Sequence, residues 1–89
     1  MPKRSYQIKN KLGMHARAAT AFVQTANRFG CEVLVRKGNI EVNGKSIMGV
    51  LQLAAARGQK IEVEAEGQDE QDALDAIGEL IDDFFGEGE

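Results

Sequence analysis

The spacing of hydrophobic and polar positions changes several times along the chain, and each change marks a predicted element. Alternation over residues 6–9 predicts a short strand. Alternation over 31–36, a turn at 37–39 and a return at 40–42 predict a β-hairpin. A further alternating run over 61–66 predicts a strand with one acidic face exposed to water.

Three other segments carry hydrophobic residues at helical spacing. The first helix is expected from Ala16 to residue 29, and Gly30 is expected to end it. The second is expected over 47–56, with Ser46 as its N-cap. The third follows a turn at 67–69. The hydrophobic stripes expected on the first and third helices consist of Ala19, Phe22, Val23, Ala26, Phe29, Ala73, Leu74, Ile77, Leu80, Ile81 and Phe84.

The predicted order is β-α-β-β-α-β-α. Four strands with one wet face and helices on the other predict a two-layer α/β sandwich. The 89 residues suit one domain, over residues 1–89. Residues 85–89 are rich in glycine and acid, and we expect them to form a frayed tail.

Composition excludes several classes of protein. Hydrophobic residues make up 43% and charged residues 28%, which is typical of a folded domain. No apolar run is long enough to insert into a membrane, and the polar start of the chain leads us to expect no signal peptide. A lone cysteine, Cys31, excludes an internal disulfide and favours a reducing compartment, so we expect a cytoplasmic protein.

The net charge of −3 hides a strong asymmetry. Residues 1–60 contain all 11 Lys and Arg with only two acids, Glu32 and Glu41, which gives +9. Residues 61–89 contain the other 12 acids and no base, which gives −12. The basic part could attract an acidic partner or a phosphate, or the asymmetry could simply keep the protein soluble. An acidic protein without interleaved aromatic and basic residues is not expected to bind nucleic acid.

The only histidine, His15, stands where a loop is predicted to enter the first helix. Unpaired amides at a helix start, here those of Ala16 and Arg17, favour an anion. The Arg17 side chain adds a fork of donors that suits phosphate oxygens. Gly13 allows the loop to bend so that the imidazole stays exposed. A neutral imidazole is a nucleophile near pH 7, so His15 is a candidate acceptor of a phosphoryl group.

Two alternatives weigh against this hypothesis. A lone histidine at a helix start is most often a capping or surface residue. Cys31 could pair with His15 as a nucleophile, but its strand pattern favours a buried and inert thiol. No second histidine supports a metal site, and we expect neither a metal nor another cofactor.

The chain resembles the HPr family, the histidine-containing phosphocarriers of the bacterial phosphoenolpyruvate-dependent phosphotransferase system. The resemblance covers roughly residues 5–84. It depends on two motifs, Gly-Met-His-Ala-Arg at 13–17 and Lys-Ser-Ile-Met-Gly-Val at 45–50. It implies an α+β fold, an open-faced β-sandwich whose four-stranded antiparallel sheet is covered on one face by three helices.

The resemblance also implies roles. His15 would accept phosphate at Nδ1 from phosphorylated enzyme I and pass it to a histidine of an enzyme IIA-type acceptor, while Arg17 would hold the phosphoryl oxygens. Ser46 would be a regulatory site for HPr kinase/phosphorylase, in addition to its local role as a cap. Such a protein is a carrier, not an autonomous enzyme, and we expect a monomer.

The second predicted helix is apolar on nearly every side, which a helix on one face of a sheet cannot bury. Some of the three side chains Ile47, Met48 and Leu51 are therefore expected to be exposed. They could reflect crowded packing or form a docking patch for partners, which we favour. A second hypothesis makes the protein a regulatory binding module that uses this patch, with His15 phosphorylation as its switch. A third, an independent enzyme, lacks any base in the sequence to assist His15.

Two positions depart from the family. Most HPr sequences have proline where this chain has Ala18, so the entry to the helix is expected to be less rigid. Leu12 stands where sugar-type members often carry a small polar residue. Residues 10–14 look more like the nitrogen-related branch, whereas the Ser46 motif looks like the kinase-regulated branch. The sequence therefore leaves open whether sugar uptake or regulation lies downstream.

Overall fold

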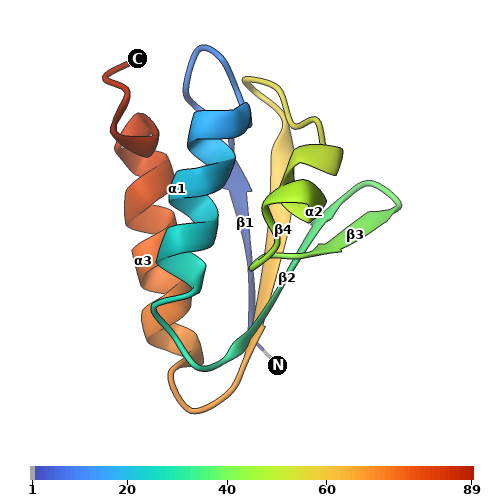
Figure 1. The fold of residues 1–89 in the computed structure, drawn as a ribbon, viewed down its shortest axis with the longest axis vertical. Helices are drawn as coiled ribbons and strands as arrows, with labels where there is room; N and C mark the ends of the chain where they lie inside the picture. The colour runs from blue at the N-terminus through green and yellow to red at the C-terminus, as the bar shows by residue number, and fades with distance from the viewer. Residues whose placement is uncertain (1) are drawn as a thin grey trace.

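A computed structural model describes residues 2–89 (Figure 1). The elements in chain order are β1 (Lys3–Gln7), α1 (Ala16–Ala26), β2 (Glu32–Lys37), β3 (Ile40–Asn43), α2 (Ile47–Gln52), β4 (Lys60–Glu66), α3 (Glu70–Asp82) and a 3₁₀ turn (Phe84–Gly86). The predicted order of strands and helices is confirmed.

The four strands form one antiparallel sheet in the order β1-β4-β2-β3, and the three helices cover one of its faces (Figure 1). The β2–β3 hairpin is the predicted one, with Val35 opposite Val42. β4 enters between β1 and β2 after two crossovers. The open-faced β-sandwich of the α+β class is therefore confirmed.

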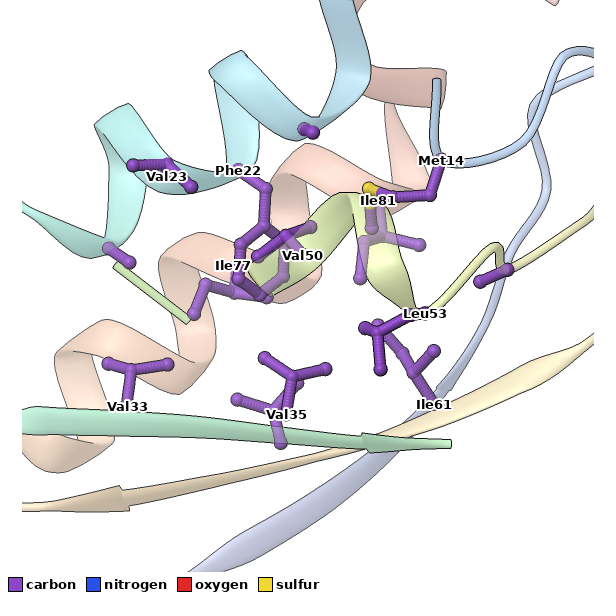
Figure 2. Close-up of a cluster of buried hydrophobic side chains, with 14 of the residues drawn as sticks. Met14, Phe22, Val23, Val33, Val35, Val50, Leu53, Ile61, Ile77 and Ile81 are labelled. Carbon is purple, nitrogen blue, oxygen red and sulfur yellow. The ribbon is translucent and has the colours of Figure 1, made fainter. Parts of the chain in front are cut away.

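The core fills the space between the sheet and the helices. Figure 2 shows Phe22, Val50 and Ile77 of the helices meeting Val33 and Val35, which rise from the sheet. Phe22 and Ile77 are fully buried. Burial of such side chains stabilises a fold by roughly 1.5–3 kcal/mol each. None of the helices in the described residues is long and apolar enough to span a bilayer.

The predicted helix ends are wrong in two places. α1 stops at Ala26 because the Asn27 side chain donates to the Val23 carbonyl (3.0 Å) and caps the last turn. α2 stops at Gln52, and Ala54 follows in the left-handed region at φ +48°. Phe29, Leu80 and Phe84, which were expected to be buried, are only partly so.

The acidic face predicted for β4 is only partly wet. Glu64 retains 4% exposure because Arg36 of β2 lies over it and donates to its carboxylate (2.8 Å). Arg36 also bonds Glu41 (2.6 Å) and Glu62 (3.2 Å) on the neighbouring strands. A buried carboxylate is tolerated there because it is paired and hydrogen-bonded.

The expectation of a frayed tail over 85–89 is wrong. Phe84 and Phe85 both have φ near +54°, which reverses the chain after α3 and buries the Phe85 ring. The Lys11 amide donates to the Glu89 carbonyl (3.1 Å). The last residues therefore lie against the β1–α1 loop, at the same end of the molecule as the start of α1 (Figure 1).

Candidate functional site

Hydrogen bonds and a buried side chain hold the loop before α1 in place. The Asn10 side chain, fully buried, donates to the Gly13 carbonyl (2.7 Å). The Met14 amide donates to the Ala55 carbonyl (2.8 Å), and its side chain points into the core (Figure 2). Gly13 has φ +69°, a conformation that favours glycine. These contacts fix the backbone one residue before His15.

His15 is the N-cap of α1, with extended backbone angles of φ −89° and ψ −177°. The Arg17 amide donates to its Nδ1 atom (3.3 Å). Its imidazole therefore lies beside an amide of the first helical turn, as the sequence predicted. The Ala16 amide belongs to the same turn, and the Arg17 side chain is exposed beside it.

The other ring nitrogen of His15, Nε2, contacts Oε2 of Glu87. The second carboxylate oxygen of Glu87 accepts from the Asn10 side chain (2.9 Å). The Glu87 side chain is 9% exposed and that of His15 29%. Sequence analysis missed this residue and found no base for His15. The only signal for it is the pair of phenylalanines after the third helix, which anchors the chain end near the core.

Glu87 carries a negative charge at neutral pH. Burial by itself raises the pKa of its carboxyl group, but the hydrogen bonds from Asn10 and His15 outweigh burial. The positive charge of Arg17, and that of the imidazole in its protonated form, act in the same direction, and the net effect lowers the pKa of Glu87 below its ordinary value. An ionised acid is thus held against the imidazole.

A pocket of about 520 Å³ opens at His15, with lining from Lys11, Leu12, His15, Ala16, Arg17, Glu87 and Glu89. Two cations and the helix amides make its surface suitable for an anion. Leu12 lies at its edge with 70% exposure. Across residues 2–89 no group of three His, Cys, Asp or Glu is arranged to hold a metal ion.

Ser46 is the N-cap of α2, as predicted, and its hydroxyl accepts from the Gly49 amide (3.2 Å). Met48 is 70% exposed and Ile47 41%, whereas Leu51 is half-buried against the core. We call these three side chains the α2 patch. Its exposure agrees with the expectation drawn from the apolar pattern, and Leu51 contributes least.

Cys31 is buried, and burial raises the pKa of its thiol. A protonated thiol is a poor nucleophile. Its amide and that of Gly30 donate to the Asp69 carboxylate (3.0 and 2.9 Å). Cys31 therefore belongs to the structural framework and not to the site around His15.

Comparison with known proteins agrees with this geometry. The family described as the PTS HPr component phosphorylation site matches residues 2–83. The phosphocarrier protein HPr of Neisseria meningitidis serogroup A is 55% identical over 89 residues, which cover the whole of both chains. The chain belongs to the HPr family.

Solved HPr structures share the fold. The crystal structure of HPr-C-His from Thermoanaerobacter tengcongensis superposes with a TM-score of 0.94 at 46% identity, over 98% of each chain. A crystal structure of an HPr dimer from the same organism matches with a TM-score of 0.78, over 98% of this chain and 100% of that one. An HPr-type chain can thus occur as a dimer, so the expectation of a monomer is not confirmed.

Proposed function

We propose that this protein is a phosphocarrier that accepts a phosphoryl group on Nδ1 of His15 from phosphorylated enzyme I. The observation that carries the proposal is the position of His15 as cap of α1, with Nδ1 facing the Arg17 amide in a pocket that Lys11 and Arg17 help to line. Membership of the HPr family supports the same role.

The transfer needs one bond to form and one to break. Nδ1 of His15 attacks phosphorus, and the bond between phosphorus and the donor group of enzyme I breaks, so that the donor group leaves with the bonding electron pair. The phosphoryl oxygens are then stabilised by the helix amides and by the Arg17 guanidinium. In a second transfer His15 is the donor: a histidine of an enzyme IIA-type acceptor attacks phosphorus, and the bond to Nδ1 breaks. The protein acts as a stoichiometric carrier of the cytoplasm and works as a monomer.

Incubation with enzyme I and radiolabelled phosphoenolpyruvate tests this role. Wild type is expected to gain about one phosphate per chain that is lost in acid, and His15→Ala is expected to gain none. A Thr20→Ala variant, which alters a half-buried residue of the same helix, serves as the control. Absence of label on the wild type would refute the phosphocarrier role. Light scattering of the same samples measures the molecular mass, which should be that of a monomer.

Ser46 is proposed as a regulatory phosphorylation site. A phosphate on its hydroxyl would replace the cap bond to the Gly49 amide with a charged one, so the fold should survive. Incubation with HPr kinase/phosphorylase and ATP should give acid-stable phosphoserine on wild type and none on Ser46→Ala. Ser5→Ala, at an exposed serine of β1, is the matched control. Label that persists in Ser46→Ala would move the site elsewhere.

A second candidate function is a regulatory binding module that uses the α2 patch. The exposed Met48 and Ile47 favour it, since large apolar side chains in water often mark a docking surface. Met48→Gln should weaken binding to enzyme I. The apparent KM of enzyme I for this protein should rise, while the kcat of His15 phosphorylation should change little. Ile40→Gln, at an exposed apolar residue of β3 outside the α2 patch, controls for lost apolar surface. Equal effects of both variants would remove the α2 patch from docking.

A further inference from the structure

We propose that Glu87 is a positioning residue for phosphoryl transfer, whose carboxylate keeps the proton of the His15 ring on Nε2 and the lone pair on Nδ1. This inference rests on the proposed phosphocarrier function. It concerns the chain end, which lies 72 residues from His15 along the sequence.

The two contacts of the His15 ring support the same tautomer independently. A carboxylate only accepts hydrogen bonds, so the nitrogen that faces Glu87 carries the proton. A neutral imidazole has one such proton, which leaves Nδ1 as an acceptor. On that side the Arg17 amide, which can only donate, points at Nδ1 (3.3 Å). The nitrogen with the free lone pair is therefore the one beside the helix amides.

Glu87 is held in place from both sides. Its Oε1 accepts from Asn10 (2.9 Å), and the same amide nitrogen donates to the Gly13 carbonyl (2.7 Å). One buried side chain thus ties the loop that positions His15 to the residue that orients its ring. On the other side Phe85 is buried in the core, and the Glu89 carbonyl accepts from Lys11 (3.1 Å).

The arrangement favours the reaction in two ways. In the opposite tautomer Nδ1 carries the proton and cannot attack phosphorus until that proton is lost. In the favoured tautomer Nδ1 attacks directly, Nε2 keeps its proton, and the positive charge that the ring gains lies beside the Glu87 carboxylate. An acid that orients a catalytic imidazole acts in the same way in serine proteases. Lys11 and Arg17 supply the positive charge on the phosphate side, and Glu89 adds a second acid at the rim.

The same contact allows a contrary outcome. If Glu87 mainly competed with phosphate for Lys11 and Arg17, its removal would accelerate phosphorylation. The buried bond to Asn10 and the approach to Nε2, away from Nδ1, favour positioning over competition. The rate of Glu87→Gln therefore separates the two roles by its direction.

The experiment measures ¹⁵N shifts of the neutral His15 ring, together with phosphorylation by enzyme I. Wild type should show the Nε2–H form, and Glu87→Gln and Glu87→Ala should shift the population toward Nδ1–H. Their kcat should fall roughly tenfold or more, as expected for loss of a charged hydrogen bond, with a smaller change in KM. Glu66→Gln, which removes an exposed acid at the end of β4, should match wild type.

Exchange of the Lys11 amide proton, which bonds Glu89, reports whether the chain end remains docked in each variant. A wild-type ring in the Nδ1–H form, unchanged ring shifts in both variants, or faster phosphorylation of Glu87→Gln would overturn the role of Glu87. Wild type that shows the Nε2–H form but accepts no phosphate would instead refute the phosphocarrier function. The two failures are therefore distinguishable.

Discussion

A Cβ atom on Gly13 would lie 2.7 Å from the carbonyl oxygen of Ala55. That carbonyl also accepts the hydrogen bond from Met14 which fixes the loop before His15. The β1–α1 loop and the segment after α2 thus meet backbone to backbone, and only glycine allows so close an approach. The position of the candidate phosphorylation site therefore depends on a residue without a side chain.

Gly13→Ala is expected to destabilise the fold and displace His15. The positive φ costs about 1–2 kcal/mol for alanine, and the clash adds about 1–3 kcal/mol. Gly58→Ala is the matched control, because Gly58 has φ +88° but no atom within 4 Å of an added Cβ. Urea denaturation of both variants isolates the clash. Equal losses of unfolding free energy in the two variants would show that the β1–α1 loop moves away from the Ala55 carbonyl and avoids the clash.

Arg17→Ala is expected to slow phosphorylation of His15 by roughly 10- to 100-fold, as for loss of charged hydrogen bonds to phosphate. The phosphorylation rate of Arg17→Lys should lie between those of wild type and Arg17→Ala, because lysine keeps the charge but loses the planar fork. Stability should change by less than about 0.5 kcal/mol, since the side chain is exposed. Arg28→Ala, at an exposed arginine beyond the other end of α1, controls for net charge. A transfer rate in Arg17→Ala equal to that of Arg28→Ala would remove Arg17 from the mechanism.

Asp69 should make stability depend on pH at the acid end. Hydrogen bonds, chiefly from the Gly30 amide, lower the pKa of its carboxyl group in the folded state. Its contribution is therefore complete above the ordinary aspartate range and is lost as the pH falls through the lower folded value. Asp69→Asn should be less stable than wild type at pH 7, and the two should converge once the pH falls below the lowered pKa of Asp69 in the folded state. Urea midpoints at several pH values check this, with the exposed Asp72→Asn as control. A constant difference between wild type and Asp69→Asn across the pH range would contradict it.

Local sequence patterns predicted what depends on neighbouring residues. The element order, the helix start at His15, the cap at Ser46 and the exposure of Met48 all follow from spacing and capping chemistry. These features need no knowledge of which segments meet in space, and all four are confirmed.

Features that depend on tertiary contact were not predictable in this way. Glu87 reaches His15 only because the chain reverses at two phenylalanines with positive φ, which no periodicity indicates. Glu64 is buried only because Arg36 crosses from the next strand. A glycine- and acid-rich chain end is typical of disorder, yet buried Phe85 outweighs that tendency.

The early end of α2 provides a final prediction. Ala54 follows the C-cap Leu53 in the left-handed conformation at φ +48°, a position that glycine usually occupies after a helix. Glycine there would remove a strain of about 1–2 kcal/mol, whereas its greater freedom in the unfolded chain would cost about 0.4–1 kcal/mol. Relief of strain is larger, so Ala54→Gly should raise the free energy of unfolding by roughly 0.5–1 kcal/mol.

Ala56→Gly is the matched control for that variant. Ala56 is exposed, two residues further on, and its φ is not positive. The substitution should therefore show only the entropic loss and lower the free energy of unfolding by about 0.4–1 kcal/mol. Thermal and urea unfolding of both variants measure whether the free energy of unfolding rises in Ala54→Gly and falls in Ala56→Gly. If both variants lost stability equally, the left-handed conformation of Ala54 after α2 would not be strained.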